Sequence, residues 1–160
     1  MNLVVMVFFW FAFISAPDLA EVRKMYPDAS KSEKAAIVFT EKLVSAEESN
    51  KTLLAYKGAS YTIISKFAKT ISDKVRHLKQ GARLIDQAAV SEPNNIEIRL
   101  IRLSVQESVP KGVNYRKNKK EDKNFILVHY HEQKGILKDY VKNFILSSNS
   151  FSTADRQIVK

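Results

Sequence analysis

Apolar residues recur every three to four positions along most of the chain, which is the spacing of one buried helix face. The clearest case follows Ser72, an expected N-cap, where apolar residues stand at positions 75, 78, 82, 85 and 89. Similar spacing predicts helices over 18–26, 31–48, 51–67 and 136–145, the first of which should end at or before Pro27. The expected N-caps of the first three are Asp18, Ser30 or Ser32, and Asn50.

Two segments are compatible with either helix or strand. Residues 96–109 begin with the alternating sequence IEIRL, yet an Asn95 cap, a length of about 14 residues and the lack of a partner strand favour a helix. That helix has a second apolar face around Ile101, which predicts an element sandwiched between neighbours. Residues 124–132 stay open between helix and strand, with helix favoured and Gly135 as its C-cap. The pattern as a whole predicts an all-α fold.

Two stretches of the chain share a pattern of small and large residues. They are Leu54-xxx-Gly58-xx-Tyr61 and Gly81-xxx-Ile85-xx-Ala88-xxxx-Pro93. These spacings resemble the two helices of a tetratricopeptide repeat, and the resemblance covers about residues 50–109. It implies stacked antiparallel helical hairpins in which small residues let paired helices approach closely, and a non-catalytic scaffold that binds a peptide or protein in a groove. Gly58 and Gly81 lie 23 residues apart, where the repeat has about 12, so longer helices than the standard ones are expected.

The N-terminus carries an unbroken apolar run over residues 3–14, followed by Ser15, Ala16 and Pro17. The run is shorter than the roughly 20 residues that span a bilayer, and it has the length of a signal-peptide core. We expect residues 1–16 to be a signal peptide that is cleaved after Ala16, which makes the protein secreted or periplasmic and leaves a single all-α domain over 17–160. No Lys or Arg precedes the run, so an uncleaved anchor or a buried first helix stays open.

The composition and the motifs of the sequence exclude several kinds of catalytic and metal-binding chemistry. The 160 residues include no cysteine, which excludes disulfides, thiolate catalysis and Cys-ligated metals. Nucleophile motifs, Gly-rich phosphate loops and H-E-x-x-H are absent from the sequence. His129 and His131 would face the same way on a strand, but on a helix they would point about 160° apart and could not share an ion by themselves. The sequence therefore predicts no enzyme activity, no cofactor and no metal site.

The net charge of +9 is concentrated in two blocks. Residues 51–83 hold eight Lys or Arg against one Asp, and residues 111–123, in a predicted basic loop over about 110–123, hold six against two acids. On the helix after Ser72, a cationic stripe is formed by Arg76, Lys79 and Arg83. Such concentration favours an acidic or anionic partner.

A second polar strip lies on the helix after Asn95, between its two apolar faces. It consists of Arg99, Arg102 and Gln106. If the hairpins stack, the strip would line a groove, where Arg can bind a carboxylate through two hydrogen bonds. The alternative is that both arginines pair with acids of neighbouring helices in the same chain.

The sequence thus predicts a secreted, non-catalytic interaction protein that binds a protein or peptide through a helical groove near these strips. An acidic partner is among those that the charges allow. The alternative is a protein that binds anionic lipid or polymer of the cell envelope through its basic patches. Nucleic acid is not the expected partner, because the leader directs the chain outward and Tyr115 is the only aromatic residue in the basic loop. The oligomeric state stays open.

Overall fold

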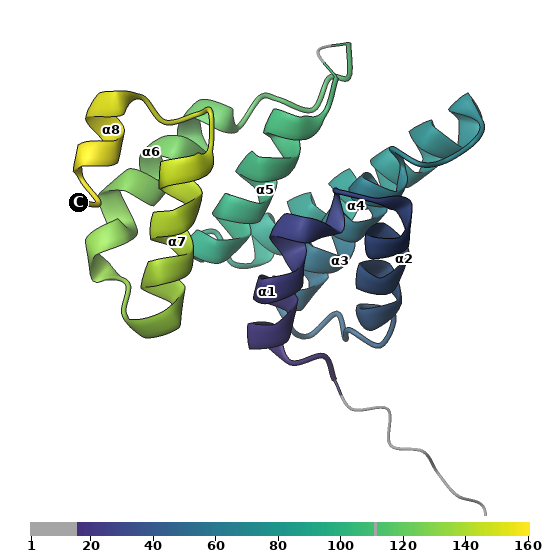
Figure 1. Ribbon diagram of the computed structural model, residues 1–160, viewed down its shortest axis with the longest axis horizontal. Coiled ribbons are helices and arrows are strands. Elements are labelled where there is room, and N and C mark those ends of the chain that lie inside the picture. Colours follow the sequence, from purple (N-terminus) through teal and green to yellow (C-terminus); the bar gives the residue numbers. More distant parts are fainter. Residues whose placement is uncertain (1–15, 111) are drawn as a thin grey trace, which may run out of the picture.

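The protein is all-α, as the apolar pattern predicts. The computed structural model describes residues 16–110 and 112–160, and in these ranges it contains helices and no strand (Figure 1). The elements in chain order are α1 (Leu19–Ala29), α2 (Glu33–Lys42), α3 (Lys51–Ile64), α4 (Ile71–Ser91), α5 (Ile96–Ser108), α6 (Lys119–His129), the 3₁₀ turn η1 (Tyr130–Glu132), α7 (Gly135–Ser147) and α8 (Thr153–Gln157). Residues 124–132, which could have formed a strand, are helical.

The polar caps place most helix starts where the sequence predicts them. The side chains of Asp18, Ser32, Asn50 and Asn95 each accept a hydrogen bond from a backbone N–H in the first turn of their helix. The prediction for α4 was wrong, because Thr70 rather than Ser72 is its cap. The Thr70 hydroxyl accepts from the Asp73 N–H and donates to the Asp73 carboxylate, 2.7 Å away, and this reciprocal pair fixes the start of the helix.

Other helix boundaries also differ from the expectation. Helix α1 continues through Pro27 to Ala29, because a proline in the last turn removes a single hydrogen bond while Ala29 becomes buried. Helix α2 ends at Lys42, and α6 begins at Lys119, so the basic loop is shorter than predicted. Gly135 does not cap the end of α6: it begins α7 with a φ of 53°, a left-handed conformation that suits glycine at a chain reversal.

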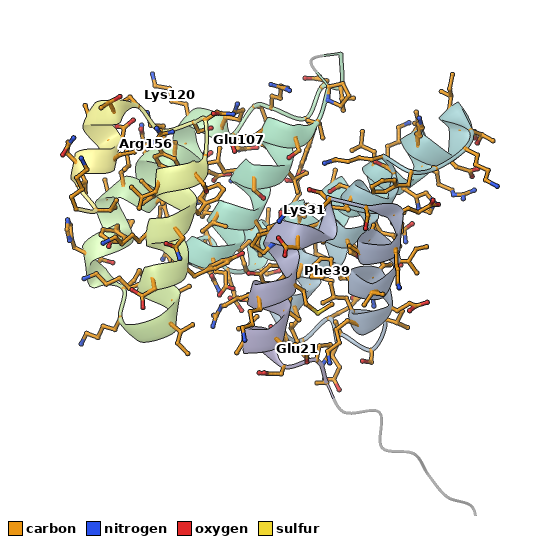
Figure 2. The ribbon with its side chains drawn as sticks, in the orientation of Figure 1. Glu21, Lys31, Phe39, Glu107, Lys120 and Arg156 are labelled. Atoms are coloured by element: carbon orange, nitrogen blue, oxygen red, sulfur yellow. The ribbon has the colours of Figure 1, made fainter. Side chains whose placement is uncertain are left out.

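Helix α5 lies between two apolar cores. The first core is built by α1 to α4, includes the fully buried Phe39 of α2 (Figure 2), and receives Ile98 and Ile101 from α5. The second is built by α6, η1 and α7 together with Phe151 and Val159, which flank α8, and it receives Leu100 and Leu103 from the other side of α5. This confirms the prediction that the helix after Asn95 is sandwiched between neighbours.

Helices α3 and α4 pack backbone to backbone where Gly58 faces Gly81. A Cβ atom added to Gly58 would lie 2.7 Å from the Gly81 carbonyl oxygen and 2.7 Å from Cγ1 of Ile85. The two small residues therefore allow the close approach that their spacing suggested. The N-terminal end of α4 extends past this contact to the edge of the molecule, where Ile71 is 81% exposed (Figure 1).

The predicted leader, residues 1–16, lies outside the described residues except for Ala16, so its cleavage stays a prediction. Within the part that the structure describes, no helix is both long enough and apolar enough to cross a bilayer.

Candidate functional site

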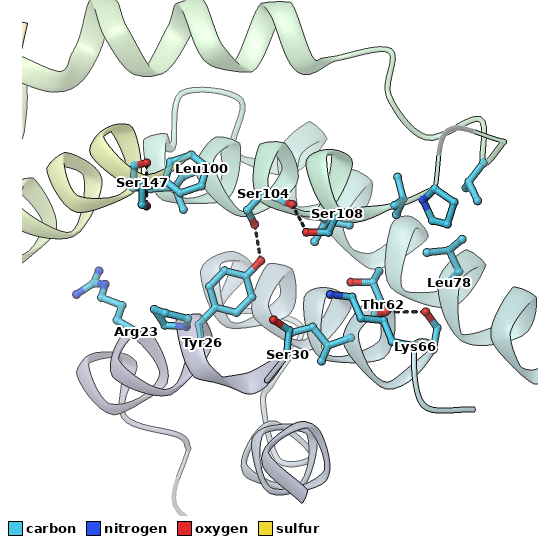
Figure 3. A pocket seen from close by; sticks show the side chains of 18 of the residues that line it. Arg23, Tyr26, Ser30, Thr62, Lys66, Leu78, Leu100, Ser104, Ser108 and Ser147 are labelled. Atoms are coloured by element: carbon cyan, nitrogen blue, oxygen red, sulfur yellow. Dashed lines mark hydrogen bonds between the residues drawn. The ribbon is translucent and has the colours of Figure 1, made fainter. Parts of the chain in front are cut away.

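A hollow of about 860 Å³ lies between α1 on one side and α5 with α7 on the other, and the end of α3 and the start of α4 form its far end (Figure 3). We call it the central groove. Its volume is within the range of about 300–1,000 Å³ typical of ligand pockets. It is larger than a second hollow of about 490 Å³, which lies beside the turn between α4 and α5.

The walls of the central groove are mainly apolar. Helix α5 contributes Leu100, Ser104 and Ser108, which lie four residues apart and therefore follow one another along the groove. The facing walls carry the rings of Tyr26 and Phe144. Further apolar lining comes from Pro27, Ile63, Val75, Leu78, Val105, Val109, Pro110 and Val113.

Most hydroxyl groups along the groove are already hydrogen-bonded to the protein. Thr62 donates to the Ala59 carbonyl at 2.7 Å, Ser108 to the Ser104 carbonyl at 2.8 Å, and Ser147 to the Asn143 carbonyl at 2.9 Å. The hydroxyls of Tyr26 and Ser104 hydrogen-bond to each other across the groove (Figure 3). Because these groups are satisfied within the chain, a ligand would be held by apolar contact and charge rather than by many directed hydrogen bonds.

The charged residues of the groove are all basic. Arg23, Lys24, Lys66 and Lys74 line it, and among the described lining residues there is no Asp or Glu. Arg23 is paired with Glu97, but the three lysines form no ion pair with any residue in 16–110 or 112–160. The groove therefore offers three uncommitted positive charges around an apolar hollow.

A buried carboxylate fixes one end of the groove by joining four helices. Glu97 of α5, only 2% exposed, accepts hydrogen bonds from Nε and Nη2 of Arg23 in α1, at 2.7 and 2.6 Å, and from the Tyr56 hydroxyl in α3 at 2.8 Å. The Tyr56 hydroxyl also lies 3.1 Å from the Tyr140 hydroxyl in α7. Burial is the main cause that raises the pKa of the Tyr56 hydroxyl well above its ordinary value, and burial likewise raises the pKa of Tyr26 to about 12.

The strip predicted to line a groove lies on the opposite side of α5, against α6. Arg102 donates from Nε and Nη2 to the two carboxylate oxygens of Asp122, at 2.7 and 2.6 Å. Arg99 donates to Asp122 at 2.9 Å, to Glu121 and to the Pro93 carbonyl. These are the intrachain pairs that the sequence left open as the alternative. Neither arginine lines the central groove.

Gln106 completes this internal strip. Its side chain is fully buried, and its amide nitrogen and oxygen have no hydrogen-bond partner among the described residues. The structure thus brings the three residues of the strip together, as predicted, but places them between helices rather than at the groove. A partner-binding role for them stays a prediction.

The other predicted stripe is accessible. Arg76, Lys79 and Arg83 are exposed on α4, and none of them lines the groove, although Lys74 and Leu78 of the same helix do. Arg76 pairs with Asp73 at 2.7 Å, while Lys79 and Arg83 form no ion pair in the described part of the chain. His129 contacts Glu132 at 2.8 Å, and the described residues contain no group of three or more His, Asp or Glu that could hold a metal ion.

Sequence reasoning missed the groove residues, chiefly Ser104, Ser108 and Lys66. A signal for the first two was present, because Leu100, Ser104 and Ser108 form a further regular face on α5. Small serine side chains on that face leave a space between α5 and α1, which bulky side chains would fill. The spacing of apolar residues gives no sign that Lys66, in the turn after α3, lines the same groove.

Comparison of the chain with protein-family models, with curated proteins and with solved structures finds no match. The functional inference therefore depends on the groove and its charges.

Proposed function

We propose that the protein is a non-catalytic interaction protein that binds a peptide segment of a partner protein in the central groove. The observation that carries the proposal is an apolar hollow of about 860 Å³ with three lysines that lack an ion pair in the described chain. Apolar grooves between helices are a recurring way to bind a peptide through its apolar side chains. The resemblance to tetratricopeptide repeats and the predicted secretion agree with such a role.

A binding role is favoured over catalysis by the chemistry of the lining. General acid–base catalysis needs a titratable group within hydrogen-bond reach of the substrate, most often His, Asp or Glu. Among the described residues that line the groove there is none of these three, and most lining hydroxyls donate to nearby backbone carbonyls rather than to a base. The lining of the groove therefore suits a peptide that is bound and released without chemical change.

Blocking the groove should abolish peptide binding without unfolding the protein. The probe is a peptide enriched from a random 16-residue library on the wild-type protein. We expect Ser108→Trp to raise the Kd of that peptide at least about tenfold in fluorescence anisotropy, because an indole at this position would occupy the hollow. Ser108 is exposed and bonds only to its own helix, so the substitution should leave the fold intact.

Val128→Trp is the matched control, because it adds the same side chain at a position on α6 that is 69% exposed and outside the groove. The two variants should melt at similar temperatures, and only Ser108→Trp should weaken binding. Failure to enrich any peptide, or equal affinities for both variants, would contradict the proposal.

A second candidate function is binding to an anionic surface of the cell envelope. It is favoured by the N-terminal part of α4, which carries the exposed apolar residue Ile71 and the exposed basic residues Arg76 and Lys79. A basic helix with exposed apolar residues can contact anionic lipid. This surface would bind through the region of Ile71, whereas the groove would bind beside Leu78 and Ser108, so the position of a bound partner distinguishes the two roles.

A further inference from the structure

We propose that the peptide segment bound in the central groove carries an acidic side chain between two apolar ones, and that Lys66 binds the acid. This inference rests on the proposed function and adds the chemistry of the partner. It follows from where the positive charge lies along the groove.

Lys66 brings a positive charge into the groove between apolar surfaces. It lies in the turn after α3, and its ammonium group points into the space between α1 and α5 (Figure 3). Leu100 lies on one side of it along the groove and Leu78 on the other (Figure 3). A ligand that fills the hollow and neutralises Lys66 therefore needs its negative charge between two apolar parts.

The surrounding charges favour an anion at this position. Lys24 and Lys74 also line the groove, the described lining contains no carboxylate, and Lys66 has no ion pair among residues 16–110 and 112–160. Because every charged residue that lines the groove is basic, the groove disfavours a basic side chain of a ligand and favours a carboxylate. The ammonium of lysine is a point charge on a flexible stem, so it can accept a carboxylate from several directions while its methylene groups add to the apolar wall.

The position of the charge favours a peptide over a fatty acid. A fatty acid carries its carboxylate at one end, so pairing with Lys66 would leave the apolar wall on one side of Lys66 uncovered. A peptide with an acidic residue between apolar residues covers the walls near Leu100 and Leu78 together. Most hydroxyls of the groove are satisfied within the chain, so side-chain contacts rather than hydrogen bonds to the peptide backbone would set the preference.

Parallel selection of random 16-residue peptides on the wild type and on Lys66→Glu tests the inference. On the wild type we expect enrichment of Asp or Glu at one position between apolar residues, and on Lys66→Glu a switch to Lys or Arg at that position. A peptide selected on the wild type should bind Lys66→Glu at least about tenfold more weakly, because the substitution replaces attraction between opposite charges by repulsion between like charges. Lys79→Glu is the matched control, because it reverses an exposed charge outside the groove and should leave the Kd unchanged.

The outcomes separate this inference from the proposed function. The role of Lys66 would be overturned if the selected peptides were apolar with no acidic position and bound the wild type and Lys66→Glu equally. If the same peptides lost affinity for Ser108→Trp, the groove would still be the peptide site. Enriched peptides insensitive to Ser108→Trp would overturn both. The proposal of a peptide ligand would be overturned if laurate bound more tightly than any selected peptide and this binding were lost in Ser108→Trp. That result would identify an acyl amphiphile as the occupant of the groove.

Discussion

Gly58→Val should lower the free energy of unfolding by about 3 kcal/mol or more, measured by urea denaturation followed by circular dichroism. The first carbon of the new side chain would already lie 2.7 Å from the Gly81 carbonyl oxygen and 3.0 Å from the Ile85 nitrogen. Both atoms belong to the backbone of α4, so no side chain can rotate to make room. The helices would have to separate, and the apolar contacts along α3 and α4 would be lost.

Gly58→Ala gives a graded comparison if the valine variant does not fold. It adds the clashing carbon alone, and the better helix propensity of alanine offsets about 1 kcal/mol of the loss. Gly112→Val is the matched control, since a Cβ atom there has no neighbour within 4 Å and its stability should change by no more than about 0.5 kcal/mol. If Gly58→Val were as stable as the wild type, the close packing of α3 on α4 would be contradicted.

Asp122→Ala should lower the free energy of unfolding by about 3 kcal/mol in the same assay, because it leaves buried positive charge without its counterion. Asp122 is fully buried and accepts three hydrogen bonds from Arg99 and Arg102. Burial acts to lower the pKa of Arg102, and the hydrogen bonds and charge of Asp122 outweigh it and hold that pKa above its ordinary value. Without the carboxylate, the guanidinium keeps only contacts of 4.0 Å to Asp86 and Glu121.

Asp28→Ala provides the control for this prediction. Asp28 pairs with Lys31 on the surface, where both side chains are well exposed, and loss of such a pair should cost no more than about 1 kcal/mol. The double variant Arg102→Met/Asp122→Leu removes both charges and should regain much of the stability lost in Asp122→Ala. Equal effects of Asp28→Ala and Asp122→Ala would show that the α5–α6 pair does not stabilise the fold.

The helices of this chain follow from local signals, which is why the sequence predicts most of them. Asn50 and Asn95 cap the helices that follow, and the apolar spacing after each defines the buried face. Predictions fail where two local choices compete: Thr70 and Ser72 are both good caps, and the reciprocal pair with Asp73 decides for Thr70. Pro27 was expected to end α1, but burial of Ala29 favours two more helical residues.

The candidate site was less predictable because it depends on tertiary contacts. The sequence shows that Arg99 and Arg102 share one face of a helix, but the acids that neutralise them lie about 20 residues further along, in α6. The groove forms on the opposite face of α5, between elements as distant in the chain as α1 and α7. Its position is set by how α1, α5 and α7 pack on one another, which the spacing within each helix does not determine.

The most direct test of the central claim, that the groove is the binding site, is to follow the ¹³C–¹H methyl signals of Leu, Ile and Val while the tightest selected 16-residue peptide is added. The account predicts that the largest shifts occur at Leu100, Val105 and Leu78, which line the groove from two helices. Ile71 at the exposed end of α4 and Val128 on α6 should remain unchanged. Shifts confined to Ile71 or Val128, with Leu100 and Val105 unaffected by a peptide that binds, would contradict it.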